Sequence, residues 1–458
     1  MNLAAESPTP SSSGSDDFAA FLDAELEVAS SNSSSDGDLA DDDAENDLQQ
    51  PRTKKLKVEE FESTRELHEM TEVATNREKT GMSDEAIPDI CPPHPGFFGG
   101  LCVRCGQVED DDASGTAFGY IHKGLRLGSR EIDRLRGADL KNLLREKKLI
   151  LILDLDHTLL HSTHIADVSA EEEYLIRQID SKNDDPARSI FRLDSIRMLT
   201  KLRPYVHTFL KEASNLFELY VYTMAERPYA LEVVKLLDPG NVYFGSKVIT
   251  QNDSTQRHLK GLDVVLGADN VVVILDDTEP VWQEHRENLI LMERYHFFAS
   301  SLRQSGINCK SLSETKKDER ESDGALATVL NVLKRIHRMF FDPVLRTDIS
   351  SRDVRQMIKM VRQEILQGCK LVFSRVFPLN SRVEDQSYWK MAEELGAICC
   401  TEVDSSVTHI VAKDSGTEKA RWALQNGKFL ISPRWIEAAR FLWQRQNEED
   451  FPVNSVKK

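Results

Sequence analysis

The sequence has few cysteines, no long apolar run and, over its first fifty residues, no basic side chain. Seven cysteines in 458 residues, three of them between positions 91 and 105, are too scattered for the disulfide framework of a small secreted protein. No run of 18 apolar residues occurs, so no transmembrane helix is expected, and the acidic, Ser-rich start does not have the pattern of a signal peptide. We therefore expect a soluble, intracellular protein without membrane partners.

An excess of basic residues is also missing. The net charge is -18, and residues 1–50 hold thirteen acidic residues with neither Lys nor Arg, so the other 408 residues carry only about -5. Bulk charge therefore does not indicate a nucleic-acid-binding face, and no direct nucleic-acid partner is expected. With 40% hydrophobic residues, the chain can bury the cores of two or three domains.

Residues 1–88 lack sustained periodicity and are rich in Ser, Asp, Glu and Asn, which predicts a disordered acidic tail. Two features interrupt it. The apolar residues Phe18, Phe21, Leu22 and Leu26 fit either a short helix that folds on a partner or a solvated acidic segment. The basic cluster Pro51 to Val58 is accessible to an import receptor in such a tail, and it predicts a nuclear localisation signal.

Residues 89–116 contain two pairs of soft metal ligands. Cys91 and His94 form one pair and Cys102 and Cys105 the other, each with two intervening residues, and a glycine-rich loop of seven residues joins them. Each pair has the spacing of one half of a tetrahedral zinc site, which predicts a Cys3His zinc knuckle. The alternative is a set of reduced cysteines in a Gly/Pro loop.

The aliphatic run Leu149 to Leu153 predicts a buried strand of a parallel sheet, because helices on both faces leave no polar alternation. Asp154 and Asp156 follow at the carboxyl end of this strand, where open α/β sheets bind ligands. Burying two like charges is costly without a cation, and oxygen ligands favour Mg²⁺. The alternative is an Asp-rich turn with Thr158 as a helix cap. The Asp-x-Asp-x-Thr spacing favours the metal site.

Three later features match this stretch. A strand over 216–222 ends at Thr223, Lys260 offers a point charge, and a strand over 271–275 ends in Asp276 and Asp277. Singly, these residues fit a helix cap, a surface charge and a turn. Together, in this order, they indicate a phosphoryl-transfer site.

Strands alternating with helices over 117–343 predict a parallel α/β domain, with helices at Glu131 to Leu144, Tyr229 to Leu237 and Leu326 to Phe341. Residues 308–324 are polar and predict a mobile loop. The apolar spacing within Arg346 to Leu366 predicts a linker helix, which we assign to residues 344–365. Residues 366–458 predict a second, small α/β domain with strands at Lys370 to Phe373 and Thr408 to Ala412 and helices at Trp389 to Leu395, Glu418 to Leu424 and Pro433 to Leu442.

The ordered motifs resemble the haloacid dehalogenase superfamily. The longer strings at 153–162, 201–204, 220–227 and 275–282 are similar to those of FCP/SCP-type RNA polymerase II C-terminal-domain phosphatases, over roughly residues 118 to 343. The trailing unit resembles a BRCT domain through Gly368, Gly396, Ala397, the segment 408–412 and Trp435. This combination is similar to the FCP branch, and the acidic leader with its cysteine cluster resembles the plant members.

The resemblance implies roles for the motif residues. Asp154 is expected to attack a phosphoserine and form an aspartyl-phosphate, and Asp156 to act as general acid and base. Mg²⁺, or another divalent ion such as Mn²⁺ or Co²⁺, is expected on Asp154, the Asp156 carbonyl and Asp277, with Asp276 orienting this shell. The expected phosphate ligands are Thr158, Thr223 and Lys260.

One segment departs from the family pattern. Residues 249–253 occupy the place of an Arg-Asp pair, and Gln251 lacks the guanidinium group, which leaves Arg203 or Arg227 as alternative phosphate contacts. In the BRCT-like unit, Ser374 and Lys419 match positions that bind phosphate in some BRCT domains. The alternative there is a unit used only for protein contacts.

The resemblance implies a nuclear enzyme that dephosphorylates the heptad repeats of RNA polymerase II and regulates transcription, with general transcription factor IIF as a further candidate partner. A second hypothesis is a nuclear phosphoprotein-binding scaffold with a weak phosphatase module. A small-molecule phosphatase is disfavoured by the leader and the BRCT-like unit.

Overall fold

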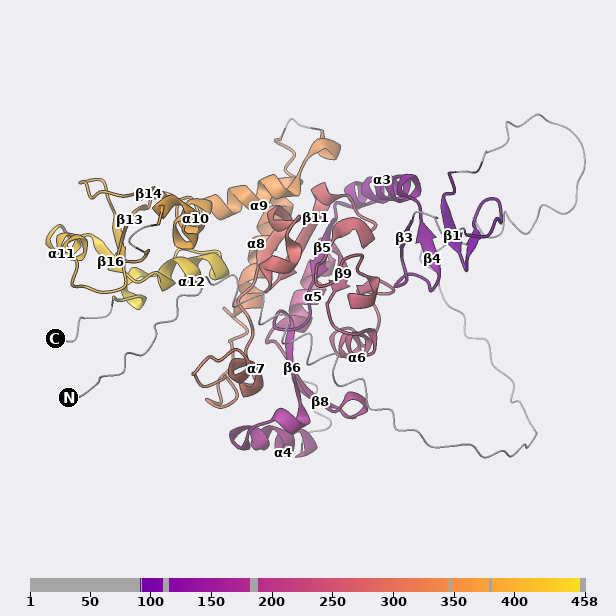
Figure 1. Ribbon diagram of the computed structural model, residues 1–458, viewed down its shortest axis with the longest axis horizontal. Coiled ribbons are helices and arrows are strands. Elements are labelled where there is room, and N and C mark those ends of the chain that lie inside the picture. Colours follow the sequence, from indigo (N-terminus) through magenta and orange to yellow (C-terminus); the bar gives the residue numbers. More distant parts are fainter. Residues whose placement is uncertain are drawn as a thin grey trace, which may run out of the picture.

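The computed structural model describes residues 91, 93–109, 115–181, 188–345, 348–378 and 381–453 (Figure 1). The predicted acidic tail, its apolar segment at 18–26 and the basic cluster at 51–58 lie outside these residues. Across the described ranges, none of the helices combines the length and the apolar composition needed to span a bilayer.

The first described unit is a small antiparallel sheet with strand order β2-β1-β4-β3. Its strands are β1 (Gly96–Phe98), β2 (Leu101–Cys102), β3 (Thr116–Ala117) and β4 (Leu125–Leu127). Gly99 and Gly100 turn β1 into β2 with φ values of 58° and 81°, which only glycine adopts without strain. The sheet leads into helix α3 (Ser129–Glu146), which contains the predicted helix 131–144.

The central domain is built on a five-stranded parallel sheet, which confirms the predicted α/β class. The order is β10-β9-β5-β11-β12. The strands are β5 (Leu149–Leu153), β9 (Phe217–Tyr222), β10 (Val248–Ile249), β11 (Val272–Asp276) and β12 (Leu289–Leu291). All five residues of β5 are fully buried between β9 and β11, which explains its uninterrupted aliphatic sequence.

Helices pack around this sheet (Figure 1). They are α5 (Val206–Ser214), α6 (Arg227–Leu237), α8 (Ala325–Phe340) and α9 (Val354–Gln363). Helix α9 starts later than the predicted linker helix, because the Asp353 side chain accepts from the Arg355 amide at 2.9 Å and caps it. Its residues Val354, Ile358 and Val361 are buried in the central core, so α9 is part of this domain's packing.

An antiparallel insertion with order β6-β8-β7 follows the first motif. Its elements are β6 (Leu160–His164), α4 (Glu173–Ser181), β7 (Ile190–Leu193) and β8 (Met198–Leu202). Helix α7 (Ala299–Gln304), from later in the chain, contacts it, since the Ala299 amide donates to Glu172 at 2.8 Å. Residues 308–324 form neither helix nor strand, but they are attached to this region. The Tyr295 hydroxyl donates to Asp318 at 2.8 Å, and the Ser313 hydroxyl donates to buried Glu172 at 2.5 Å.

The C-terminal domain is a four-stranded parallel sheet of order β14-β13-β15-β16 with three helices, drawn in yellow and orange in Figure 1. Its elements are β13 (Lys370–Ser374), α10 (Ser387–Glu394), β14 (Ile398–Cys400), β15 (His409–Ala412), α11 (Glu418–Gln425), β16 (Phe429–Ile431) and α12 (Arg434–Leu442). Arg440 of α12 pairs with Glu279 of the central domain at 2.9 Å, and the Arg362 guanidinium lies 5.3 Å from the Trp443 ring centroid. These contacts attach the domain to the centre.

The packing of α9 can be tested by mutation. Ile358 is 1% exposed and Met360, on the same helix, is 49% exposed. We expect Ile358→Ala to lower the free energy of unfolding by about 3 kcal/mol, because it leaves a cavity in the central core. Met360→Ala should change it by less than about 0.5 kcal/mol. Chemical denaturation followed by circular dichroism checks this, and equal stability of the two variants would show that α9 is a free linker.

Candidate active site

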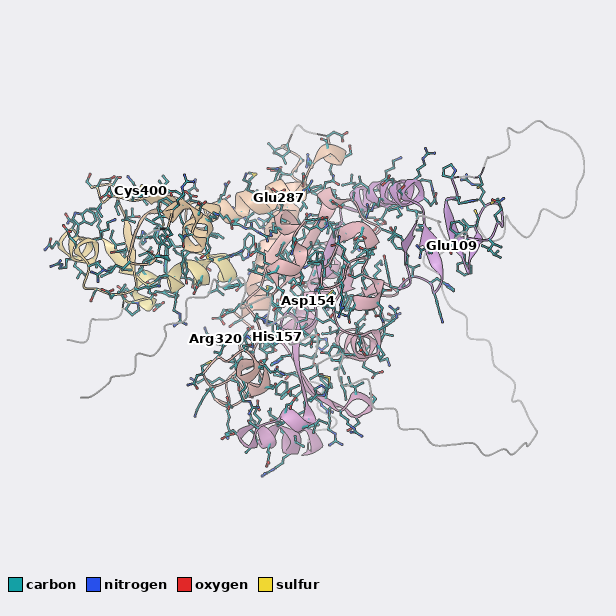
Figure 2. The ribbon with its side chains drawn as sticks, in the orientation of Figure 1. Glu109, Asp154, His157, Glu287, Arg320 and Cys400 are labelled. Atoms are coloured by element: carbon teal, nitrogen blue, oxygen red, sulfur yellow. The ribbon has the colours of Figure 1, made fainter. Side chains whose placement is uncertain are left out.

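Four of the predicted site residues lie at the carboxyl ends of three neighbouring parallel strands. Asp154 follows β5, Thr223 follows β9, Asp276 ends β11 and Asp277 follows it. The carboxyl ends of parallel strands share one edge of a sheet, where ligands bind in open α/β folds. Figure 2 shows Asp154 and the neighbouring His157 between the central sheet and the β6-β8-β7 insertion.

Lys260 reaches this edge from the loop that precedes the short 3-10 helix Leu262–Val264. Its Nζ atom lies 2.7 Å from Asp154 Oδ1 and 2.6 Å from Asp276 Oδ2, and its side chain is 3% exposed. Burial by itself lowers the pKa of Lys260, but the two carboxylates outweigh burial and hold this pKa above its ordinary value. The ammonium group therefore stays charged inside the protein.

Both carboxylate oxygens of Asp276 accept hydrogen bonds from the protein. Its Oδ1 accepts from the Thr278 amide at 2.8 Å, and its Oδ2 accepts from Lys260 and from Trp282 Nε1 at 2.8 Å. The Trp282 ring centroid also lies 5.7 Å from the Lys260 nitrogen. Asp276 thus orients the ammonium group toward Asp154.

Asp277 lies beside a second cation. Its Oδ2 is 2.6 Å from Arg294 Nε, and its Oδ1 accepts from the Thr158 hydroxyl at 3.3 Å. Burial raises the pKa of Asp277, and the Arg294 guanidinium opposes that rise.

Carboxylate oxygens of Asp154, Asp276 and Asp277 lie within 4.8 Å of one another. Three carboxylates face the two bonded cations, Lys260 and Arg294, so the cluster has one excess negative charge. Burial raises the pKa of Asp154, with Lys260 opposing and the two neighbouring carboxylates adding to the rise. A buried set of oxygen ligands with excess negative charge fits a hard divalent cation, so these residues could hold a metal ion.

The Asp156 side chain has different surroundings from this cluster. Its Oδ1 accepts a short hydrogen bond from the Tyr229 hydroxyl, and Tyr229 Oη also lies 2.7 Å from Ser162 Oγ. Burial raises the pKa of Asp156 to about 6, although the hydrogen bond from Tyr229 opposes the rise. A carboxyl group with a pKa near neutrality can both give and take a proton.

Two buried hydroxyl groups complete this edge. Thr158 is fully buried and Thr223 is 2% exposed. The Thr223 amide donates to the Ile249 carbonyl at 3.0 Å, and its Oγ1 accepts from the Ala225 amide at 3.1 Å. The Thr223 hydroxyl proton remains available to a ligand oxygen.

The structure gives Arg203 a different role from the predicted phosphate contact. Its guanidinium is fully buried and paired with Glu319 at 2.7 Å, and it donates to the carbonyls of His157 and Thr158 at 3.3 and 3.0 Å and to that of Glu293 at 3.1 Å. All of these donors are used within the protein, so Arg203 positions the loop that follows Asp156. It is not placed to bind a phosphate.

Arg227, the other arginine predicted to contact phosphate, is more exposed to solvent than Arg203. Arg227 begins helix α6, and its Nη1 lies 3.3 Å from Asp253 Oδ2 with the side chain 35% exposed. Asp253 also accepts from the amide and hydroxyl of Thr250, at 2.9 and 2.8 Å. Gln251, the residue that departs from the family pattern, lies in the same turn, and its backbone amide donates to the Ala225 carbonyl at 3.4 Å. Arg227 as a phosphate contact stays a prediction.

Sequence reasoning missed three residues of this site: Tyr229, Trp282 and Arg294. Trp282 ends the string 275–282 that carried the family resemblance, so its position relative to Asp276 was a usable signal. Tyr229 begins a predicted helix, and the sequence does not distinguish it from an aromatic residue that packs in the core. Arg294 meets Asp277 only through the fold.

In the C-terminal domain, Ser374 ends β13 and is 5% exposed. Its hydroxyl donates to Thr417 Oγ1 at 2.8 Å, and Thr417 caps α11 by accepting from the Ala420 amide. Lys419 donates to the Thr401 carbonyl. Both predicted residues therefore lie at the N-terminal end of α11, and their binding of phosphate stays a prediction.

Comparison with known families identifies two regions of the chain. Residues 149–318 match the family of NLI interacting factor-like phosphatases, and residues 361–439 match the BRCA1 C Terminus (BRCT) domain. The second match confirms the BRCT-like unit predicted from the sequence.

Among whole proteins, the chain is 51% identical to RNA polymerase II C-terminal domain phosphatase-like 4 of Arabidopsis thaliana, over 100% of this chain and 99% of that one. It is 23% identical to an RNA polymerase II C-terminal domain phosphatase of Saccharomyces cerevisiae, over 91% and 75% of the two chains. The solved structure of Fcp1, an essential RNA polymerase II CTD phosphatase, covers 70% of this chain and 100% of its own, with a TM-score of 0.54 and 26% identity. That likeness confirms the predicted haloacid-dehalogenase-like fold, and the chain belongs to the family of RNA polymerase II C-terminal domain phosphatases.

Proposed function

We propose that this protein is a Mg²⁺-dependent phosphatase that removes phosphate from serines in the heptad repeats of the RNA polymerase II large subunit. The observation that carries the proposal is the buried Lys260 ammonium, 2.7 Å from Asp154 beside the carboxylates of Asp276 and Asp277. This arrangement offers a nucleophile, a fixed positive charge and metal ligands at one strand edge. The names of the relatives support the polymerase as substrate.

In the first step, a carboxylate oxygen of Asp154 attacks the phosphorus atom and the bond from phosphorus to the serine oxygen breaks. Asp156 gives its proton to the leaving oxygen, so free serine and an aspartyl-phosphate are formed. The Thr223 hydroxyl donates to one phosphoryl oxygen, and the Thr158 hydroxyl turns from Asp277 Oδ1, to which it donates at 3.3 Å, to a second phosphoryl oxygen. Lys260 neutralises part of their charge from a site where water is excluded, which strengthens that interaction.

In the second step, Asp156 takes a proton from a water molecule, which attacks the phosphorus atom. The bond from phosphorus to Asp154 breaks, inorganic phosphate leaves, and the enzyme returns to its starting state with Asp156 protonated. The pKa of about 6 suits both directions of proton transfer near neutral pH. The Tyr229 hydroxyl keeps the Asp156 side chain in position between the two proton transfers.

Mg²⁺ is the proposed ion, held by Asp154, the backbone carbonyl of Asp156 and Asp277, with Asp276 orienting the set; Mn²⁺ and Co²⁺ have similar oxygen-ligand preferences. When bound, the ion screens the negative charges of the nucleophile and the phosphoryl group from each other. The buried carboxylates at the site are the support for this proposal.

A nuclear location and a role in regulating transcription follow from the proposed substrate. General transcription factor IIF remains a candidate partner. The direct test is phosphate release from synthetic phosphorylated heptad peptides, with Mg²⁺ and with EDTA. Turnover that EDTA does not affect would contradict the metal site. Binding of the peptides without any turnover would favour a scaffold.

Replacing the nucleophile should abolish turnover. Asp154→Asn keeps the shape of the side chain but cannot form the aspartyl-phosphate, so we expect kcat to fall by at least about 10⁴-fold. Asp263→Asn, an exposed acid three residues after Lys260, is the matched control and should retain activity. Heptad-peptide assays with Mg²⁺ compare them, and comparable turnover by Asp154→Asn would rule out this nucleophile.

Replacing the buried ammonium should slow the chemistry and change its pH dependence. We expect Lys260→Ala to lower kcat/KM on the order of 100-fold or more, as for loss of one oxyanion donor. Burial then raises the pKa of Asp154 further, because no ammonium opposes it, so the acidic limb of the pH profile should move to higher pH. Lys235→Ala, whose side chain is 68% exposed, is the control. A folded Lys260→Ala enzyme with an unchanged pH profile would contradict the prediction.

Removing one hydroxyl group should shift the alkaline limb instead. Tyr229 donates to Asp156 and opposes the rise of its pKa, so Tyr229→Phe should raise that pKa by roughly one unit. Asp156 must be protonated to release the serine, so the alkaline limb of kcat/KM should move to higher pH. The profiles of Tyr229→Phe and of the control Tyr243→Phe test this, and movement to lower pH would refute the assigned role.

A further inference from the structure

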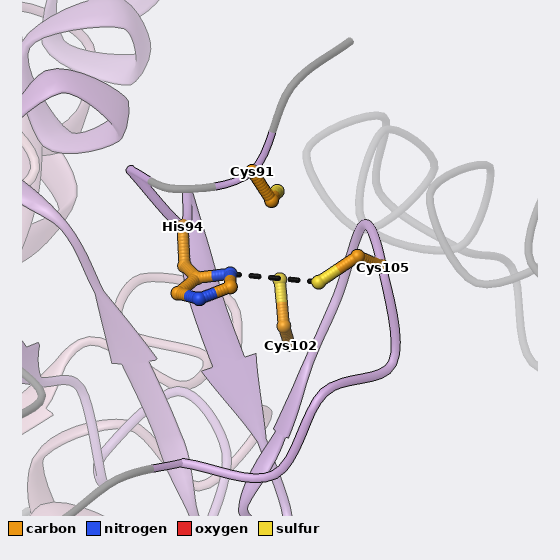
Figure 3. A group of neighbouring side chains, drawn as sticks. All are labelled: Cys91, His94, Cys102 and Cys105. Carbon is orange, nitrogen blue, oxygen red and sulfur yellow. Dashed lines mark hydrogen bonds between the residues drawn. The ribbon is translucent and has the colours of Figure 1, made fainter. Parts of the chain in front are cut away.

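The N-terminal sheet holds a second group of side chains that can bind a metal ion. These residues come earlier in the sequence than the carboxylates of the active site. The Sγ atoms of Cys91, Cys102 and Cys105 and a ring nitrogen of His94 all lie within 4.8 Å of one another. Cys105 Sγ is 3.5 Å from His94 Nδ1. Figure 3 shows the His94 ring and the Cys102 and Cys105 sulfur atoms converging, with Cys91 beside them. Ligand atoms about 2.3 Å from a tetrahedral zinc ion are separated by distances of this size.

The backbone around the second ligand pair supports metal binding. The Arg104 amide points at Cys102 Sγ at 3.5 Å, and the Gly106 amide donates to the Cys102 carbonyl at 2.9 Å. Gly106 has a φ of 73°, which only glycine adopts without strain and which turns the chain back after Cys105. An amide directed at a cysteine sulfur stabilises the thiolate, the form that binds metal.

The hairpin that carries these ligands has little core of its own. Strands β1 and β2 are three and two residues long, and their large side chains Phe98 and Leu101 are 40% and 49% exposed. Phe97 is buried, but its ring packs on His94 at 5.3 Å and does not join a larger apolar cluster of the described residues. Small units with so little buried apolar area usually need a metal ion or disulfides.

A disulfide is not formed here. All seven cysteines of the chain lie within the described residues, and each is a free thiol. Three sulfur atoms and one imidazole are a complete ligand set for a structural zinc ion, with no position left open for substrate.

We propose that Cys91, His94, Cys102 and Cys105 bind one structural Zn²⁺, which ties the β1-β2 hairpin to the segment before it. On binding, the cysteine sulfurs release their protons to solvent and His94 binds through neutral Nδ1. The hairpin pairs with β4, whose residues Leu125 and Leu127 are buried in the central core.

The sheet and helix α3 contact the short 3-10 helix Leu262–Val264, which follows Lys260. The Tyr120 hydroxyl, just after β3, donates to the Val264 carbonyl at 2.9 Å, and Arg136 of α3 donates to the carbonyls of Leu262 and Val265 at 2.6 and 3.1 Å. Zinc therefore supports a layer that packs behind the active-site loop, without touching the reacting groups.

The test measures metal content in the full chain. We expect about one zinc per chain by elemental analysis after dialysis without chelator, and the visible absorption of tetrahedral cobalt-thiolate coordination after exchange with Co²⁺. Cys105→Ser should lose both signals, because a hydroxyl is a poor zinc ligand, and Cys105→His should keep the zinc. Cys309→Ser, which removes an exposed thiol elsewhere, should retain both signals.

The zinc content should be independent of phosphatase activity. Asp154→Asn, which lacks the nucleophile, should still hold one zinc per chain, so the outcome stands whether or not the phosphatase proposal holds. Cys105 is exposed, so Cys105→Ser should remain folded by circular dichroism with a lower melting temperature. Wild-type protein without zinc after preparation in zinc, or Cys105→Ser with full zinc content, would overturn the proposal.

Discussion

The Lys260 ammonium lies between Asp154 and Asp276, at 2.7 and 2.6 Å, with almost no exposure to solvent. Removing one partner from a buried ion pair leaves a charge without compensation and costs about 3 to 5 kcal/mol. This constraint couples three parts of the chain. Strands β5 and β11 must be neighbours for their terminal carboxylates to share one cation, and the loop before Leu262 must be held so that the cation reaches them. Tyr120 and Arg136 hold the 3-10 helix that follows this loop, by donating to the carbonyls of Val264 and Val265.

A second buried cation, Arg203, fixes the other side of the site. Its guanidinium joins the carbonyls of His157 and Thr158 to Glu319 in the irregular segment 308–324. The loop that carries Thr158 is thereby attached to a region far later in the chain. Because each guanidinium donor meets a carbonyl or carboxylate, this arginine contributes to the shape of the site and has no capacity left for a substrate phosphate.

Asp154 and Asp156 are separated by one residue, yet they lie in different environments because the strand ends just before them. Strand β5 stops at Leu153, and the chain then turns through His157, which has a φ of 61°. Asp154 therefore stays beside Lys260, whereas Asp156 turns to the Tyr229 hydroxyl. Proteins assign acid and base roles by placing similar groups in different surroundings, and the irregular backbone after Leu153 does so for these two carboxylates.

The sequence alone determined the parallel sheet, because the aliphatic runs at 149–153 and 271–275 have no polar alternation, and it determined which residues stand at the strand ends. It also marked Cys91, His94, Cys102 and Cys105, whose spacing is local. It did not show the edge strands β10 and β12, which at two and three residues are too brief for a periodic signal. It also did not show the insertion β6-β8-β7, whose strands mix polar and apolar residues. Only the tertiary structure decided that Arg203 is buried and paired with Glu319, that Tyr229 donates a hydrogen bond to Asp156, and that Arg294 pairs with Asp277. The first two contacts join residues 116 and 73 positions apart, and arginine and tyrosine fit many surroundings equally well. Their roles therefore depend on long-range packing, which no local pattern of residues specifies.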